Sequence, residues 1–389
     1  MDRRGAHVPA PGLPAHDGDQ PGERPERHAE PDPDGAVGQP NVPVKMLDEL
    51  TELDRRIIVA LQHDGRASWR AIAEMVGGTV ATVTRRGQQL LSSGVARIAV
   101  LPALGSEGPV DAFLVRINCA PGTQLQVAEE LVGHPDVRFI TLVTGGYDLI
   151  AELVVHGGST HYPQIIQQLQ SIRGVERWRS DLIMHVYKVS YDWSRQLFAS
   201  TMKLPESAAE SLAQVDAGVC DPSHFDDQDR AILTALRDDG RLTFKSVADG
   251  LGMNESSVRR RFERMRQLGC MDTLTLVPAS ALGMGAETLL TVNVAPGQLE
   301  AVAQALRAYP AVRYLAATLD QNSLFCEVIT PSTEDLYSFI TSSLSTLEGV
   351  LGWNAAMELL FLKRGFVETP WWRAQVGLPA RRGASTTSV

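Results

Sequence analysis

The chain repeats one long segment of itself at a fixed spacing. Adding 175 to a residue number in the first half reaches a matching residue in the second half, without a gap. The segment LDRRIIVALQHDGR at 53–66 returns as QDRAILTALRDDGR at 228–241, and HPDVRFI at 134–140 returns as YPAVRYL at 309–315. Coincidence would not hold one offset over so many separate matches. The sequence therefore predicts two copies of one structural unit, joined in a single polypeptide.

The first part of each copy has a helical pattern. Leu53, Ile57, Ile58 and Leu61 recur on one face of a helix that ends at an Asp-Gly-Arg turn, and the second copy repeats this face. A short second helix ending at glycine follows, and Asn254, a good N-cap residue, opens the third helix of the second copy. Three helices followed by an extended run are typical of a winged helix-turn-helix. The predicted domains cover residues 46–99 and 222–275.

The second part of each copy mixes strands and helices. DAFLVRINC, VRFITLVT, DLIAELVV and RWRSDLIMHVYK have strand character, and TQLQVAEELVG and THYPQIIQQLQSI have helical character. The order βαββαβ predicts a ferredoxin-like domain whose sheet has helices on one face. The other face, which we expect to carry Phe113 and Val115, needs a cover, and the duplicate sheet supplies one. The predicted domains cover residues 109–190 and 285–365.

The remaining segments contribute little to a core. Residues 1–45 are rich in Pro, Gly, Asp, Glu and Arg, so we expect a disordered N-terminal arm. Residues 191–221 are expected to link the halves, and residues 366–389 to form a C-terminal tail that docks partly through Trp371 and Trp372. The predicted fold class is therefore α+β, a tandem duplication of a winged helix-turn-helix and a ferredoxin-like domain.

Composition narrows the class of protein. No apolar run is long enough to cross a bilayer, so we expect no membrane partner. The four cysteines are scattered without a CxxC pair, which disfavours a disulfide framework or a cysteine zinc site and fits a reducing cytoplasm. We expect no cofactor, no catalytic residue and no metal, because the common phosphate, dinucleotide, nucleophile and zinc motifs do not occur and His156 and His161 have no third ligand nearby. The formal net charge of −10 still allows one local basic surface.

Positive charge is concentrated on the third helix of the second copy. Between Glu255 and Gln267 this segment carries five arginines against two glutamates. A recognition helix places its N-terminal residues at base edges, where Arg, Ser, Thr and Asn supply the donors. The alternative is a solvated helix with internal pairing, such as Arg259 with Glu263. The predicted DNA contacts of this copy are Asn254, Ser256, Ser257, Arg259, Arg260 and Arg261.

The corresponding helix of the first copy is less basic. Its two arginines match Arg260 and Arg261 of the second copy. Gly87 stands where the second copy has Phe262, which we expect to cost an apolar contact and about 1 kcal/mol of helix propensity. The alternative is a helix retained for packing alone. The predicted DNA contacts of this copy are Thr82, Thr84, Arg85 and Arg86.

Both copies resemble the Lrp/AsnC family of bacterial transcriptional regulators, also called feast/famine regulators. VRRRFERMRQLG at 258–269 is similar to the recognition helix of that family, and VTGGYDLIAELVV at 143–155 is similar to the signature of its ligand-sensing domain. The resemblance covers two domains in order, twice, over residues 47–188 and 222–363. It implies a cytoplasmic, nucleoid-associated protein that binds double-stranded DNA and a small-molecule effector, typically an amino acid. Fusion would make an obligate pseudo-dimer, and we expect a homo-oligomer of the fused chain.

The resemblance also implies an effector site. Two adjacent glycines free backbone N–H groups, and Asp148 is able to hold an ammonium group. The alternative is a tight hairpin with Gly and Asp as turn residues. The second copy has DQNS at 320–323 instead, so we hypothesise that sensing is biased to the first half and DNA affinity to the second. The predicted effector contacts are Thr144, Gly145, Gly146, Tyr147 and Asp148.

Two other functions are compatible with this plan. Siroheme decarboxylases share it without binding DNA, and such an enzyme would need a large cavity lined by Arg, Lys and His. The second half has no histidine within residues 225–389, and its arginines concentrate on the recognition helix. An assembly scaffold would need both third helices to be inert. Trp178 and Trp353, at matched positions, are expected to pack in a core or an interface.

Overall fold

The structure describes most of the chain beyond its first 49 residues. The computed structural model covers residues 50–104, 108–195, 202–203, 220–320 and 323–379. Its contacts separate Met1–Pro40 from Asn41–Val389, and every described residue belongs to the second of these units. The expected arm at 1–45 and most of the expected linker at 191–221 therefore lie outside the described residues.

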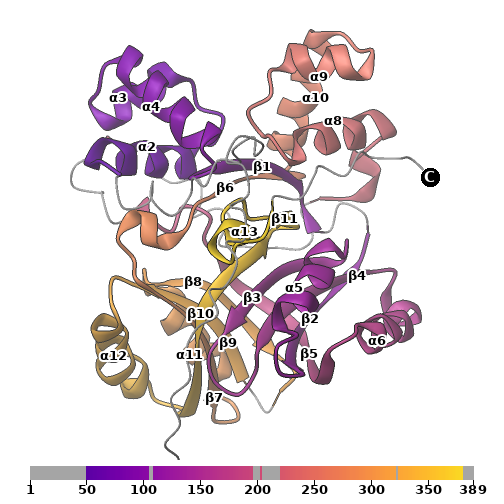
Figure 1. Ribbon diagram of the computed structural model, residues 1–389, viewed down its shortest axis with the longest axis vertical. Coiled ribbons are helices and arrows are strands. Elements are labelled where there is room, and N and C mark those ends of the chain that lie inside the picture. Colours follow the sequence, from indigo (N-terminus) through magenta and orange to yellow (C-terminus); the bar gives the residue numbers. More distant parts are fainter. Residues whose placement is uncertain (1–49, 105–107, 196–201, 204–219, 321–322, 380–389) are drawn as a thin grey trace, which may run out of the picture. The chain divides into compact units, whose positions relative to one another are not determined.

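Each half begins with three short helices that form what we call a head (Figure 1). The first head contains α2 (Glu52–His63), α3 (Trp69–Val76) and α4 (Val80–Ser92), and the second contains α8 (Asp227–Arg237), α9 (Phe244–Leu251) and α10 (Glu255–Gln267). Hydroxyl groups cap the first head, since the side chain of Thr79 accepts a hydrogen bond from the Thr82 amide at 3.3 Å. Asn254 lies at the N-cap of α10 as predicted, but its side chain makes no capping hydrogen bond.

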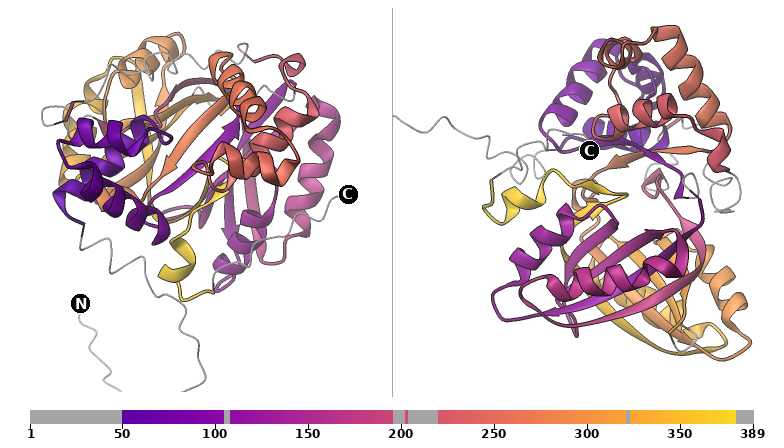
Figure 2. Two further views of the ribbon diagram at one scale, coloured as in Figure 1. Left: turned by 90° about the horizontal axis from the view of Figure 1, so that it is seen from above. Right: turned by 90° about the vertical axis from the view of Figure 1, so that its right-hand side faces the viewer.

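The strand that follows each head pairs with the other half instead of forming a separate wing. β1 (Arg97–Pro102) and β6 (Met271–Leu276) run antiparallel as a two-stranded ribbon, from Arg97 opposite Leu276 to Pro102 opposite Met271. Both strands continue past the predicted domain ends at 99 and 275. Figure 2 shows the two heads side by side on this ribbon.

Two arginines at matched positions fasten the heads to each other. The guanidinium of Arg241 donates to the carbonyls of Gly65 and Ala67 at 2.7 and 3.0 Å, and it lies over the Trp69 ring. Arg66 makes the reciprocal contacts with Gly240 and Leu242. Since each arginine crosses to the opposite head, the ribbon and these contacts fix the relative placement of the two α4/α10 helices.

The remaining strands close into one barrel that both halves build. The first half supplies β2 (Val110–Cys119), β3 (Val137–Val143), β4 (Leu149–His156) and β5 (Val175–Val189). The second supplies β7 (Ala286–Val294), β8 (Val312–Thr318), β9 (Ser323–Thr330) and β10 (Val350–Arg364). Each half has the ferredoxin-like strand order, and β5 pairs with β8 and β10 with β3 across the halves. Because β10 also pairs with β7, the ring of strands has no open edge.

Helices cover the outside of the barrel. These are α5 (Gln124–Gly133), α6 (Tyr162–Ser171), α11 (Leu299–Arg307) and α12 (Thr333–Ser342). The expectation for Phe113 and Val115 was wrong, because both face the helices: Phe113 meets the Tyr162 ring edge-on with centroids 5.1 Å apart. Leu114, one residue along, faces the interior with Tyr314. The run is apolar on both faces, so its alternation did not reveal which face points inward.

The C-terminal tail is docked as far as the structure describes it. β11 (Val367–Glu368) pairs with β10, and α13 (Trp372–Gln375) follows. The Trp372 side chain is fully buried and donates to Glu368 at 2.9 Å, while Arg373 pairs with Glu129 at 2.6 Å. Short 3-10 turns complete the described structure at Gly158–His161, Pro222–His224, Ala279–Leu282 and Leu344–Thr346. No helix of the described residues is both long and apolar enough to cross a membrane.

The packing lost at Gly87 is restored by a neighbour, which corrects the expected loss of an apolar contact. A Cβ atom at Gly87 would overlap the ring of Trp69, so this large side chain fills the space. The second head reaches the same filling with two medium rings, Phe244 and Phe262, whose centroids lie 5.1 Å apart.

This exchange predicts a strong coupling between the two positions. Gly87→Phe alone should destabilise the first head by roughly 2–3 kcal/mol, because the new ring overlaps Trp69. The same change in a Trp69→Phe chain should cost at least about 1 kcal/mol less, since it recreates the pair of the second head. Thermal unfolding of the two singles and the double would measure the coupling, and additive losses would contradict it.

Candidate nucleic-acid interface and ligand cavity

The helix α10, the predicted recognition helix, has one buried and one solvent-facing side. Val258, Phe262 and Met265 are buried in the second head, as their spacing predicted. The exposed residues of this helix are Glu255, Ser256, Arg259, Arg260, Arg264, Arg266 and Gln267. The polar face of α10 is therefore open, and the helix is not turned against the barrel.

The predicted arginines divide into two kinds. Arg86 donates through Nε to the carboxylate of Asp54 at 2.7 Å, and Arg261 donates to Asp229 at 3.0 Å and to Asp226 at 2.7 Å. Asp54 and Asp229 are fully buried, so these matched arginines compensate matched buried charges. Although burial opposes it, hydrogen bonds from Arg86 and Thr51 hold the pKa of Asp54 below its ordinary value. The sequence did not reveal this structural engagement of two predicted DNA contacts.

The preceding residues, Arg85 and Arg260, are the second kind. Both side chains are exposed, and neither has a hydrogen bond or ion pair with another described residue. Arg259 pairs with Glu255 at 2.9 Å, and Glu263 pairs with Arg266 at 2.7 Å. The helix therefore has internal ion pairs, as the alternative interpretation supposed, but the Arg259–Glu263 pair named for that alternative does not form.

The smaller predicted contacts lie around these arginines. Asn254 and Ser256 are exposed, whereas Ser257, Thr82 and Thr84 are partly buried. Thr82 shares a hydrogen bond of 3.0 Å with Thr79 through their hydroxyl groups. Each head therefore presents hydroxyl groups and one unpaired guanidinium at the first turns of its third helix.

The predicted effector residues form a surface loop between β3 and β4. Thr144 is tied to β10, because its amide donates to the Met357 carbonyl and its hydroxyl accepts from the Met357 amide, both at 2.9 Å. The Asp148 carboxylate accepts from the Cys119 amide at 2.8 Å and from Gln124 at 3.3 Å. Gly145 has a φ of 97°, which suits glycine. The Asp148 carboxylate is thus already engaged in hydrogen bonds that hold the loop in place.

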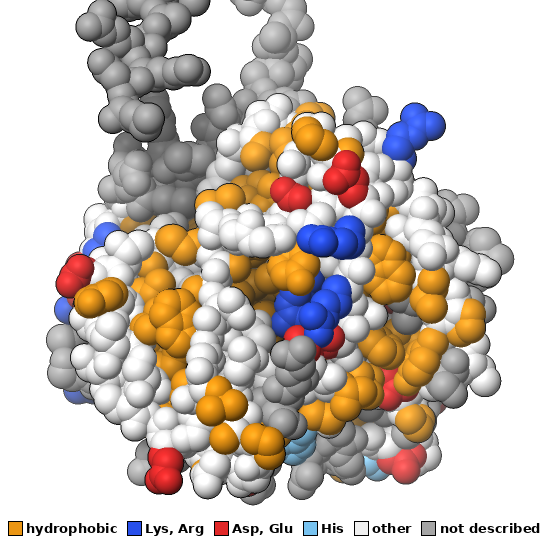
Figure 3. Space-filling view, turned by 90° about the horizontal axis from the view of Figure 1, so that it is seen from below, with side chains coloured by type: hydrophobic (Ala, Val, Ile, Leu, Met, Phe, Trp, Pro, Cys, Tyr) orange, Lys and Arg blue, Asp and Glu red, His pale blue; other side chains and the backbone are white. Residues whose placement is uncertain are grey.

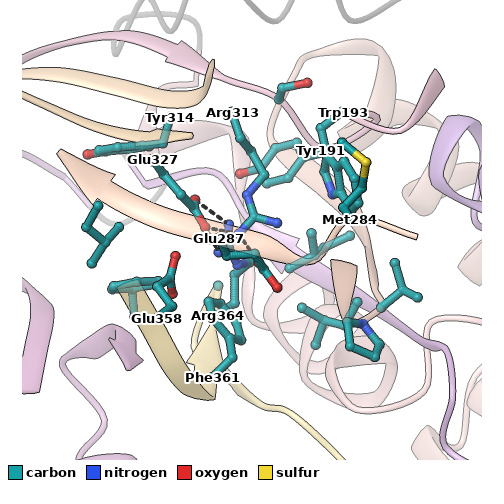
Figure 4. Close-up of a pocket in the computed structure, with 18 of the residues that line it drawn as sticks. Tyr191, Trp193, Met284, Glu287, Arg313, Tyr314, Glu327, Glu358, Phe361 and Arg364 are labelled. Carbon is teal, nitrogen blue, oxygen red and sulfur yellow. Dashed lines mark hydrogen bonds and ion pairs between the residues drawn. The ribbon is translucent and has the colours of Figure 1, made fainter. Parts of the chain in front are cut away.

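A cavity of about 240 Å³ lies elsewhere, inside the barrel at the end nearest the ribbon. It is lined by strands of both halves, by β6 and by the segment that leaves β5, and none of the five loop residues 144–148 lines it. Figure 4 shows the charged groups gathered there. The charged lining residues are Arg138, Glu152, Glu287, Arg313, Glu327, Glu358 and Arg364. Sequence reasoning missed this cluster, because its members are spread over six strands.

One carboxyl group of the cavity, that of Glu358, is buried without hydrogen-bond partners among the described residues. Both carboxyl oxygens of Glu358 are buried, and neither makes a well-formed hydrogen bond within the described part of the chain. Burial, together with the nearby charge of Glu287, raises the pKa of Glu358 to about 8.

Glu358→Gln should therefore stabilise the protein in a pH-dependent way. A raised pKa means that the folded state holds a proton which the unfolded state releases above about pH 4.5, so stability falls as pH rises toward 8. The glutamine variant lacks this loss. Its advantage in unfolding free energy over the native chain should therefore grow by roughly 1–3 kcal/mol between about pH 5.5 and 8. Denaturant unfolding of both chains at the two pH values measures the difference, and a gain that does not grow with pH would contradict it.

The structure also brings Cys270 beside Cys220 and His224, which lie 50 and 46 residues earlier in the chain. The Cys220 and Cys270 sulfurs lie 2.6 Å apart, and His224 Nδ1 lies 3.3 Å from the Cys270 sulfur, at the end of α10. One donor atom from each lies within 4.8 Å of the others. The four cysteines are scattered along the sequence, but two of them lie together in the folded chain. His156 and His161 belong to no such group among the described residues.

Comparison with known families accounts for both parts of each half. The AsnC-type helix-turn-helix domain matches residues 50–91 and 225–266, and the Lrp/AsnC ligand binding domain matches residues 112–193 and 287–364. Both matches begin again 175 residues later, which is the offset found in the sequence.

Relatives of single-protomer length match as well. An uncharacterised HTH-type transcriptional regulator of Pyrococcus horikoshii is 29% identical over 152 residues, which is 39% of this chain and 96% of the relative. The HTH-type transcriptional regulator FL11 of Pyrococcus abyssi is 32% identical over 143 residues, 36% of this chain and 92% of the relative. Each relative therefore corresponds to about one half of the chain.

A solved structure matches the duplicated arrangement. The siroheme decarboxylase NirDL in complex with an iron-uroporphyrin III analogue has a TM-score of 0.52 and covers 83% of this chain and 97% of its own. At 12% identity this likeness concerns the fold alone. Two complete sets of family domains and a relative at 32% identity go further: the chain belongs to the Lrp/AsnC family of transcriptional regulators, with two protomer-like halves fused in one polypeptide.

Proposed function

We propose that the chain is a sequence-specific regulator that reads double-stranded DNA with both heads, on the chromosome in the cytoplasm. The observation that carries this proposal is the matched pair Arg85 and Arg260, each exposed and without an ion-pair partner among the described residues. A guanidinium without an internal partner is available to a phosphate or a guanine edge. The proposed contacts are Thr82, Thr84, Arg85, Asn254, Ser256, Ser257, Arg259 and Arg260.

Arg86 and Arg261 take part indirectly in this proposal. Each holds its helix on a buried aspartate, and this fixes the position of the arginine that precedes it. Because Arg66 and Arg241 hold the heads in one arrangement, the two α4/α10 helices would meet two half-sites at a set spacing.

We further propose that two or more copies of the fused chain assemble. Figure 3 shows hydrophobic side chains spread over the face that lies opposite the heads. Large apolar side chains exposed in the described structure include Leu319, Leu351, Trp353 and Leu359. Trp353 is 42% exposed, whereas its counterpart Trp178 packs partly against the core of the first half. Of the two alternatives, core or interface, the exposure of Trp353 therefore favours an interface. Apolar exposure of this kind is typical of an interaction surface.

A small molecule such as an amino acid is proposed to modulate DNA binding. The loop Thr144, Gly145, Gly146, Tyr147 and Asp148 stays our proposal for a surface effector contact. Its hydrogen bonds to Met357 connect it to the other half, so a ligand there would touch the junction of the two halves.

The tetrapyrrole-enzyme alternative is favoured by the fold likeness to NirDL and disfavoured by the cavity. Among the described residues, the cavity lining has no histidine or lysine, and each of its three arginines faces a glutamate. Its volume is below the about 300–1,000 Å³ of pockets for drug-sized ligands.

Genomic footprinting of the purified full chain would test the proposed function. Protected sites with a shared sequence, and affinity that falls steeply with salt, are expected of the regulator. A chain that protects no DNA but carries a tetrapyrrole absorbance band would overturn the proposal in favour of the enzyme.

A further inference from the structure

The barrel cavity has a built-in core of two matched ion pairs. Arg138 donates to Glu152 at 2.8 and 2.6 Å, and Arg313, its counterpart, pairs with Glu327. Both arginines stand at register shifts in their strands, between Val137 and Phe139 and between Val312 and Tyr314. A β-bulge re-aims a side chain, and here it turns one guanidinium from each half into the barrel.

Only the second half adds further charges. Glu287, Glu358 and Arg364 line the cavity where the first half has Ala112, Ile183 and Val189. Counting all described lining residues, three arginines face four glutamates, so one negative charge is left without a counter-charge when all are ionised. This asymmetry runs against the hypothesis that sensing is biased to the first half, which concerned the loop at 144–148.

The excess lies between Glu287 and Glu358. Glu327 accepts from both Arg313 and Arg364, the latter at 2.5 and 3.0 Å. Glu287 receives one contact from Arg313 at 3.3 Å, and Glu358 has none that is well formed in the described structure. One oxygen of each glutamate lies within 4.8 Å of the other two. Figure 4 shows these carboxylates around one space.

Other orphaned groups mark the same cavity. The Tyr314 hydroxyl and the Arg313 Nε are buried without a hydrogen-bond partner among the described residues, and their side chains are more than nine-tenths buried. Buried polar groups in native structures are nearly always paired, so several orphans in one cavity point to a missing molecule. Tyr191, Trp193 and Phe361 supply an aromatic lining beside them.

We propose that this cavity binds a small organic ammonium compound, with its positive group between Glu287 and Glu358 and its apolar body against the aromatic lining. A cation is the ligand charge that the unmatched carboxylate requires. The volume holds roughly eight to twelve non-hydrogen atoms at about 30 Å³ per water. A bare metal ion would leave most of that space and the aromatic surface unused.

Ligand occupancy at this site would reach the heads directly. The cavity wall includes Leu274 to Val277 of β6 and its continuation, and β6 is half of the ribbon on which both heads sit. Trp193 lines the cavity while packing against the core of the first head. This consequence rests on the proposed DNA-binding function, whereas the binding site itself does not.

Calorimetry on the full chain tests the site with a matched pair of probes, 3-phenylpropylamine and its neutral isostere 3-phenylpropan-1-ol. The amine should bind at least about tenfold more tightly than the alcohol. Glu358→Gln should weaken amine binding at least about tenfold, and the exposed control Glu334→Gln should leave it unchanged. Since the ammonium displaces a proton from Glu358, amine affinity should rise about tenfold between about pH 6.5 and 7.5.

Three results would overturn the inference. They are equal binding of amine and alcohol, no binding of either probe, and tight binding of Mn²⁺ that Glu358→Gln abolishes, which would make the cluster a metal site. Unfolding curves of the glutamine variant establish that it is folded. Operator binding is measured separately. A native chain that binds no operator would contradict the proposed function, whereas amine binding that depends on Glu358 would still support the proposed binding site.

Discussion

Replacing Arg85 and Arg260 together with alanine is expected to weaken operator binding by about 100-fold. Each removes one exposed guanidinium from the first turns of a third helix, and contacts of this kind contribute about 1–3 kcal/mol apiece. If the arginines contact phosphates, the slope of log affinity against log salt should also fall by about two. Fluorescence anisotropy with a footprinted DNA fragment, measured at several salt concentrations, gives both quantities.

A matched control separates this effect from loss of charge alone. Arg173 is exposed in the connection between α6 and β5, far along the chain from both heads. Arg173→Ala removes the same kind of charge and should leave operator affinity within about twofold. The proposed interface would be refuted if the double variant kept native affinity and native salt dependence.

Arg86→Ala is expected to have the opposite profile, with a large loss of stability in the first head. It leaves the fully buried Asp54 without its arginine, and an uncompensated buried charge costs about 3–5 kcal/mol. Arg261→Ala should cost less, since Arg264 still pairs with Asp229 in the second head. Hydrogen exchange of α2 and α8 in the full chain reports each head separately.

Two companion variants make this test specific. Arg85→Ala, one residue away but on the exposed face, should change stability by no more than about 0.5 kcal/mol. Asp54→Asn in the Arg86→Ala chain should recover part of the loss, because it removes the unpaired charge. Exchange in α2 that is unaffected by Arg86→Ala would show that the ion pair carries no stability.

The fold could be predicted from the sequence because the signals that specify it are local or repeated. Helix periodicity, hydroxyl and glycine caps, and the βαββαβ order each depend on neighbours in the chain, and the offset of 175 tied them into two units. The basic third helix is equally local. These signals sufficed for the fold class, the helix-turn-helix domains and the likeness to the Lrp/AsnC family.

The sequence did not predict which side chains of an apolar strand face the barrel interior. Phe113, Leu114 and Val115 are all hydrophobic, so alternation gave no contrast, and only closure of the barrel shows that Leu114 faces inward. The compensation of Gly87 by Trp69 was hidden for a related reason: the partner lies on another helix, where packing and not propensity decides the cost.

What the sequence by itself determined is a duplicated chain in which each half joins a helix-turn-helix head to a ferredoxin-like domain. Only the tertiary structure decided which arginines stay free, since Arg85 and Arg86 look alike until a buried aspartate engages one of them. The same holds for the cavity, whose seven charged residues come from six strands and meet because the barrel closes. Charge balance in a buried space depends on three-dimensional distances, which spacing along a chain does not contain.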